Sequence, residues 1–331
     1  MCTNQPDAES CVRAEVRTAL RLAVAGVVVV FVARAVATNW DAIRSSAASL
    51  QPDWPGLLLA SVCVAAGYAV LIAAWRLLLQ RWNSPLGVLD ATRIWFVSSL
   101  GKYVPLKIWS IGAMALLARE AGASPLAATG SAIIMQLVNI AAGFAVIALA
   151  GAGDLFGAYP ALRYMSWAAL AATTIGLAIG PGVLSWAVRT ATRLVRQPAV
   201  VLPVISRGTL LVVFAANVAA WLAYGVAFGI FWRALLGHSG GISMAALAVY
   251  TASYLLGFLA LFAPGGIGVR EAALAGLLIS LRLATPADAA LLAAASRVWL
   301  TVLEIVPGLV FLPGTSLRRR SSISTPDGPA A

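Results

Sequence analysis

The sequence predicts an all-α polytopic membrane protein with about eight transmembrane helices plus a re-entrant or broken segment. Of its 331 residues, 61% are hydrophobic and only 11% are charged, whereas a soluble domain carries about a quarter charged residues. The apolar residues also gather into runs close to the roughly 20 residues that a helix needs to cross a bilayer. No polar stretch approaches the roughly 100 residues of a separate soluble domain.

Eight apolar runs account for the expected spans, and the seventh of them is short. They cover 22–33, 57–79, 127–150, 162–179, 210–232, 244–262, 272–283 and 291–312. The polar, mixed-charge residues 1–16 and the Ser/Pro/Gly-rich residues 314–331 are predicted to be disordered. A single membrane domain is predicted to cover 17–313.

Lys and Arg side chains predict the orientation, because loops on the cytoplasmic side carry an excess of them. The basic residues form four groups, and all four fall on one side if the broken segment 91–117 re-enters without crossing. Both termini are then cytoplasmic and the chain lies in the plasma membrane. We expect the net charge of +11 to meet anionic lipid headgroups, not nucleic acid. The groups are Arg13, Arg17 and Arg21; Arg76, Arg81 and Arg93; Arg189, Arg193, Arg196 and Arg207; and Arg318, Arg319 and Arg320.

Helix breakers and fixed charges interrupt the apolar segment 91–117. Glycine permits a turn and proline removes a backbone donor, so a single helix is not expected. The lysines and amphipathic rings could form a cationic notch that binds a phosphate. An interfacial turn with snorkelling lysines explains the same residues, and the pattern alone leaves both interpretations open. The breakers are Gly101 and Pro105, and the candidate substrate-binding residues are Lys102, Tyr103, Lys107 and Trp109.

A second break runs from Pro264 to Glu271 and precedes a short apolar run. A glycine-rich turn that opens a helix exposes backbone N–H groups with partial positive charge. Arg270 is unfavourable there unless an anion compensates it, so a bound anion is predicted. A plain breaker loop, with Arg270 facing water or paired with Glu304, is the alternative. The candidate substrate-binding residues are Gly265, Gly266, Gly268 and Arg270.

The last apolar run places Arg297, Thr301 and Glu304 on one helical face. Ionisable groups inside a span usually face the bundle interior and pair there. We expect either Glu271 with Arg297, or Arg270 with Glu304. Such a pair could act as a gate, couple to protons or lock two helices together.

One break in each half of the chain is typical of transporters built from inverted repeats, whose broken helices point polar ends at a substrate. The sequence is therefore compatible with an inverted repeat. No metal or cofactor is predicted, because His238 is the single histidine and Cys2, Cys11 and Cys63 lack the spacing of a metal site.

At the two breaks the chain resembles the flippase-like family that includes the transmembrane region of lysylphosphatidylglycerol synthase, the multiple peptide resistance factors. Members show Gly-Lys-Tyr-[Ile/Val]-Pro-Gly-Lys-[Val/Ile]-Trp and Pro-Gly-Gly-[Ile/Leu]-Gly-x-Arg-Glu motifs. These motifs are read here from Gly101 to Trp109 and from Pro264 to Glu271, with Leu106 where glycine is usual. The resemblance covers about 20–312. It implies movement of a phospholipid or isoprenoid-linked lipid between leaflets, and no aminoacyl-transfer domain is expected in this sequence.

Three functions remain open from the sequence. The leading hypothesis is a translocator for an anionic phospholipid or a polyprenyl-phosphate-linked lipid, with no catalytic residue. An integral-membrane transferase with a lipid-linked donor would need an acidic cluster, yet Asp154 and Asp288 are isolated. A non-catalytic membrane subunit would act with a pathway enzyme as partner. The sequence also allows a homo-oligomer.

Overall fold

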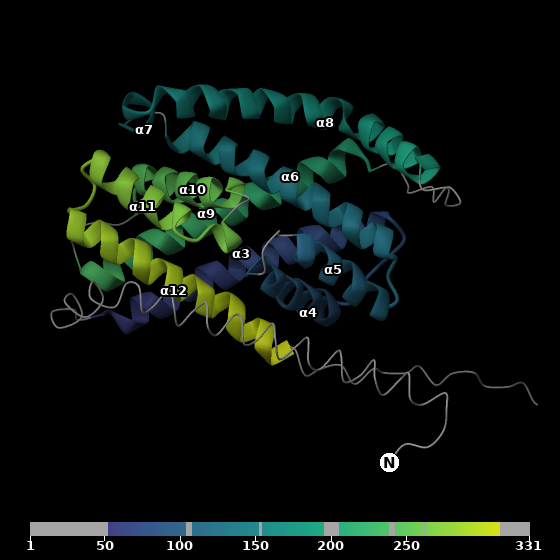
Figure 1. The fold of residues 1–331 in the computed structure, drawn as a ribbon, viewed down its shortest axis with the longest axis horizontal. Helices are drawn as coiled ribbons and strands as arrows, with labels where there is room; N and C mark the ends of the chain where they lie inside the picture. Colours follow the sequence, from purple (N-terminus) through teal and green to yellow (C-terminus); the bar gives the residue numbers. More distant parts are fainter. Residues whose placement is uncertain are drawn as a thin grey trace, which may run out of the picture.

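The computed structural model describes residues 52–103, 108–151, 154–194, 205–237, 242–260 and 263–311. All regular structure in these ranges is helical (Figure 1). The predictions for the two ends, for the first run at 22–33 and for His238 lie outside them. Orientation of the termini is therefore still a prediction.

Four helices in the described ranges are long and apolar enough to cross a membrane. They have 26 to 30 residues, hence a length of about 40 Å against a hydrocarbon core of about 30 Å. The expected count of about eight spans is not confirmed. A fifth long helix, α8 (Pro160–Leu194), lies across the top of Figure 1 beside α6. The four helices that are long and apolar enough to cross are α3 (Trp54–Arg81), α6 (Pro125–Ala150), α9 (Arg207–Leu236) and α12 (Pro286–Phe311).

The segment 91–117 folds as a helical hairpin. Helix α4 (Val88–Ser99) leads through the 3₁₀ turn η1 (Leu100–Tyr103) towards α5 (Ile108–Glu120), and α4 packs against α5. With 12 and 13 residues, each arm is about 18–20 Å long and too short to cross the bilayer alone. This geometry agrees with a segment that re-enters.

A second hairpin lies where the sequence predicts the spans 244–262 and 272–283, and these two spans are not confirmed. Helix α10 (Met244–Leu259) and helix α11 (Val269–Ser280) have 16 and 12 residues and pack side by side. Between them lies η2 (Pro264–Gly266). The chain turns here because Gly265, Gly266 and Gly268 adopt φ values of 59°, 73° and 77°, a region that side chains disfavour.

The order of elements occurs twice. Each half consists of a long helix, a short helix, a 3₁₀ turn, a second short helix and a long helix: α3–α4–η1–α5–α6 and α9–α10–η2–α11–α12. The contacts are reciprocal, since α4 packs against α12 and α10 packs against α6. Equivalent elements also meet, α3 with α9 and η1 with η2. These relations indicate an internal repeat in the order and packing of the elements.

The core lies where the two halves meet. Trp75, Trp221, Phe228 and Tyr250 are among the largest fully buried side chains. A hydrogen bond of 3.1 Å from Asn139 Nδ2 to Asn217 Oδ1 joins α6 to α9, and hydrogen bonds between polar side chains are a common link between membrane helices. Large apolar side chains, among them those of Leu58, Leu137 and Val310, remain exposed on the outer face of the bundle, as expected of a surface in contact with lipid.

Candidate functional site

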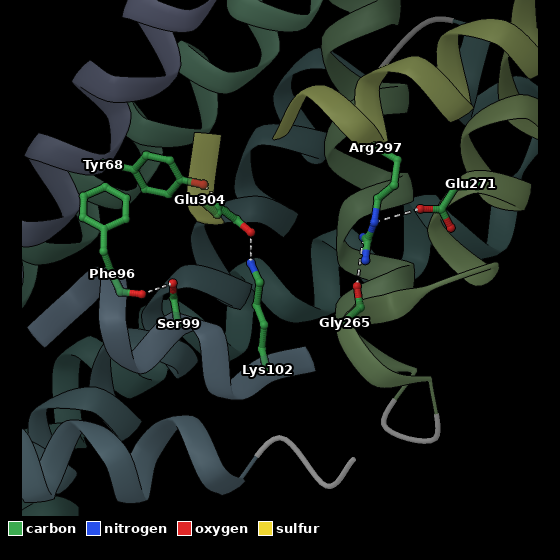
Figure 2. A network of polar contacts seen from close by, with 8 residues as sticks. All are labelled: Tyr68, Phe96, Ser99, Lys102, Gly265, Glu271, Arg297 and Glu304. Atoms are coloured by element: carbon green, nitrogen blue, oxygen red, sulfur yellow. Dashed lines mark hydrogen bonds and ion pairs between the residues drawn. The ribbon is translucent and has the colours of Figure 1, made fainter. Parts of the chain in front are cut away.

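The two breaks, far apart in the sequence, meet inside the bundle. Turn η1 contacts η2, and it also contacts α12, while η2 contacts α10. Figure 2 shows Lys102 of η1 and Gly265 of η2 in the same region, with α12 lying above both. Non-helical backbone at membrane depth is tolerated where other protein surrounds it, and the two turns supply that environment to each other.

Lys102 pairs with a carboxylate that is also held by a tyrosine (Figure 2). Lys102 Nζ of η1 forms an ion pair and hydrogen bond with Glu304 Oε2 of α12. The Tyr68 hydroxyl of α3 donates to Glu304 Oε1 at 2.8 Å. Glu304 is 8% exposed, so an ionised carboxylate needs both partners. The expected pair of Arg270 with Glu304 is not formed; Lys102 takes that place, because α12 packs against the first hairpin.

A second network ties the second hairpin to α12. Arg297 Nε lies 3.4 Å from Glu271 Oε1, and Arg297 Nη1 donates to the Gly265 carbonyl at 3.0 Å (Figure 2). The expected Glu271–Arg297 pair is therefore present. The N–H of Gly268 donates to Glu271 Oε2 at 2.6 Å, so this helix end is capped by the protein's own carboxylate. Gly265 and Gly268 thus have structural roles.

Arg270 is buried and lies over two aromatic rings. It is 6% exposed, and its guanidinium carbon lies 4.7 Å from the ring centroid of Tyr254 and 5.5 Å from that of Tyr250. Both rings come from α10, and such contacts stabilise a cation through the ring quadrupole. Among the described residues, Arg270 Nη2 is buried without a hydrogen-bond acceptor. A buried donor of this kind calls for an acceptor such as an anion or a water molecule.

The tyrosines of this region were not predicted from the sequence. Tyr68 holds Glu304, and Tyr250 and Tyr254 hold Arg270. In the sequence, each of these tyrosines places a hydroxyl inside an apolar run. Tyr250 and Tyr254 also have the i, i+4 spacing that puts them on one helical face. Tyr224 on α9 joins the group, with its ring 5.7 Å from that of Tyr68 and its buried hydroxyl without a partner among the described residues.

Of the other predicted residues, Trp109 is exposed, Tyr103 and Lys107 have side chains outside the described ranges, and Gly266 has a packing role. Trp109 at the start of α5 is 57% exposed. The backbone of Tyr103 belongs to η1, while its side chain and Lys107 are outside the description. Gly266 allows close packing, because a Cβ there would lie 2.6 Å from the carbonyl oxygen of Gly257.

The arrangement suits electrostatic binding of an oxyanion. Three cationic side chains, Lys102, Arg270 and Arg297, and two carboxylates, Glu271 and Glu304, lie on the two hairpins and α12. In the described ranges no group of three or more His, Cys, Asp or Glu side chains could hold a metal ion. Arginine and lysine side chains are the residues that bind phosphate most readily.

The chain is similar to a known protein family. The sequence model of the family described as lysylphosphatidylglycerol synthase TM region matches residues 18–308. No curated protein and no solved structure matches the chain. The match covers most of the 331 residues, and with the apolar helices it places the protein in a membrane and indicates a function related to membrane lipids. The chain therefore belongs to the family of the lysylphosphatidylglycerol synthase TM region.

Proposed function

We propose that the protein is a flippase-like translocator that moves an anionic phospholipid, or a polyprenyl-phosphate-linked lipid, between the two leaflets. The observation that supports this most strongly is the contact of η1 with η2. It gathers cationic side chains from both halves of the chain inside an otherwise apolar bundle. A lipid headgroup is the natural ligand for such a site in a protein of this family.

The repeat suggests how one site could serve both leaflets. If α6 and α8 each cross once and the first hairpin returns to the side on which it began, α9 runs opposite to α3. The second hairpin then approaches from the face opposite to the first. Because η1 contacts η2, the tips in this arrangement would meet between the two faces, as expected of an inverted repeat with its site at the midplane.

The residues that we propose for headgroup contact are Lys102 and Arg270. Arg270 Nη2 is a buried donor that lacks an acceptor among the described residues, and Lys102 carries its charge on a flexible stem that is 28% exposed. A charged group costs several kcal/mol in hydrocarbon when it is unpaired. Cations at the meeting point of the hairpins would lower that cost while the acyl chains stay in the bilayer.

A translocation assay tests this function. Full-length protein is placed in vesicles that carry labelled phosphatidylglycerol or a labelled polyprenyl-phosphate sugar, and the loss of inner-leaflet label to an external quencher is followed. We expect the wild type to speed the exchange of at least one cargo. We expect Arg270→Gln to slow it by about tenfold or more, since a hydrogen bond to a charged group contributes about 1.5–3 kcal/mol.

The matched control is Arg233→Gln, which removes the same charge from an exposed position on α9 and should exchange lipid like the wild type. If the wild type exchanges neither cargo faster than protein-free vesicles, the function is wrong. If Arg270→Gln equals the wild type, the function stands but the site assignment is wrong.

A further inference from the structure

Glu304 occupies the position at Lys102 that a lipid phosphate would take. Its Oε2 is bound to Lys102 Nζ, and a carboxylate and a phosphate offer a lysine ammonium the same kind of charged acceptor. The two cannot both neutralise one ammonium at full strength. Binding of a phosphate at Lys102 therefore competes with Glu304.

The internal repeat allows the packing around Glu304 to be compared with that of the other half. Helix α12 packs against α4 of the first hairpin as α6 packs against α10 of the second. Helix α12 contributes Glu304 to the first hairpin, whereas α6 contains no Asp, Glu, Lys or Arg at all. Helix α6 therefore contributes no carboxylate to the second hairpin. There, Arg270 is held by aromatic rings instead.

The two oxygens of Glu304 have different partners, which allows one contact to break while the other persists. Oε2 pairs with Lys102, and Oε1 accepts the hydrogen bond of 2.8 Å from Tyr68. A buried carboxylate that lost both contacts would be strongly destabilised. Because Tyr68 belongs to α3 and not to the hairpin, it can keep its bond to Glu304 when Lys102 turns to another anion.

We propose that Glu304 is a resident counter-ion, which an incoming phosphate displaces from Lys102 and which recaptures Lys102 when the phosphate leaves. This inference rests on the proposed function. In its resting state the site is self-neutralised at Lys102, and a ligand must carry an anion strong enough to replace a carboxylate. The returning Glu304 also helps release the lipid, since transport requires binding that is weak enough to reverse.

The test measures binding and not transport. The purified full chain in neutral detergent is titrated with dihexanoyl phosphatidylglycerol in a calorimeter, using wild type, Glu304→Gln and Asp90→Asn. Glutamine keeps the size and hydrogen-bonding capacity of Glu304 but removes the competing charge. We expect the half-saturating concentration to fall roughly three- to tenfold in Glu304→Gln, the range given by removing about 0.7–1.4 kcal/mol of competition.

Asp90→Asn removes one negative charge from an exposed position on the same hairpin and should bind like the wild type, which separates local competition from net charge. A parallel titration with inorganic phosphate identifies the source of the anion. If Glu304→Gln lowers the half-saturating concentration of phosphatidylglycerol alone, the site binds a lipid headgroup. If it lowers that of inorganic phosphate equally, the site binds phosphate itself. Both results support displacement.

Lys102→Gln distinguishes the inference from the proposed function. If Lys102→Gln weakens binding and Glu304→Gln leaves it unchanged or weaker, Glu304 only positions Lys102 and the inference is wrong, while the headgroup site stands. If Lys102→Gln binds like the wild type, Lys102 is not a headgroup ligand and both fail. Should Glu304→Gln not fold, Glu304→Asp, whose carboxylate is one methylene shorter, replaces it; unchanged or weaker binding there overturns the inference.

Discussion

Arg270 combines three properties that rarely occur together in a membrane helix. It is 6% exposed, it lies within the first turn of α11 where the helix dipole is unfavourable to a cation, and one of its donors lacks an acceptor among the described residues. The rings of Tyr250 and Tyr254 offset part of this cost. A residue kept in so unfavourable a place is a strong candidate for function.

The ring of Tyr254, and not its hydroxyl, should be what holds Arg270. Tyr254→Leu removes the cation–π contact and leaves space beside Arg270, so we expect a loss of roughly 1–3 kcal/mol in the free energy of unfolding, together with slower lipid exchange. Tyr254→Phe is the matched control and should lose less than about 0.5 kcal/mol. Denaturant unfolding of the purified protein checks both. Equal losses in the two variants would mean that the hydroxyl carries the contact.

At this scale the sequence predicted part of the site. The Glu271–Arg297 pair was one of two expected pairs, because an ionisable group inside an apolar run usually pairs its charge within the bundle, and the structure contains it. The Lys102–Glu304 pair could not be predicted, since it depends on α12 packing against the hairpin of the other half. The exposed position of Trp109 was equally hidden, because the sequence does not say which side of α5 faces the bundle.

At the scale of elements, the second hairpin is held together by glycine. A Cβ on Gly257 of α10 would lie 2.7 Å from the Cβ of Arg270 in α11, and a Cβ on Gly266 would lie 2.6 Å from the Gly257 carbonyl oxygen. Neither position has room for a methyl group. Close packing of this kind is how helices associate in lipid, and here it fixes where Arg270 stands.

Gly257→Ala should therefore damage the hairpin. We expect a loss of about 1–3 kcal/mol in the free energy of unfolding, because the added methyl group forces α10 and α11 apart. Gly276→Ala in α11 is the matched control: a Cβ there meets nothing within 4 Å, so alanine should leave stability unchanged or raise it by up to ~1 kcal/mol. Urea unfolding in detergent measures both. A neutral Gly257→Ala would contradict the tight packing.

The sequence located the breaks of both hairpins but not the way in which the arms of the second pack. Runs 244–262 and 272–283 are predicted as spans because they are apolar, and hydropathy measures composition and not how two helices pack. Helix α10 ends at Leu259, and α11 starts only at Val269. The hairpin depends on α10 packing against α11, a tertiary contact that a local sequence pattern does not contain.

At the scale of the whole molecule, the repeat predicts that each hairpin returns to the side from which it came. In a variant without native cysteines, single cysteines at Pro85 and Ala121 flank the first hairpin, and cysteines at Ile242 and Ala287 flank the second. All four positions are exposed. We expect a membrane-impermeant thiol reagent to label the first two from one side and the last two from the other.

A permeant reagent serves as the control and should label all four positions from either side. Labelling of Pro85→Cys and Ala121→Cys from opposite sides would mean that the first hairpin crosses the membrane. The predicted orientation, with basic loops in the cytoplasm, would fail with it, because that orientation requires 91–117 to re-enter.

The central claim is that one headgroup binds between the two hairpin breaks, in contact with Lys102 and Arg270 at the same time. A double-mutant cycle of lipid exchange tests it most directly, using Lys102→Gln, Arg270→Gln and the double variant in vesicles. We predict that each single variant slows exchange roughly tenfold and that the double variant is slowed far less than the product of the two, since residues that act on one ligand are not additive. The claim would be contradicted if the double variant were slowed by the product of the two single factors. It would also be contradicted if Lys102→Gln exchanged lipid at the wild-type rate.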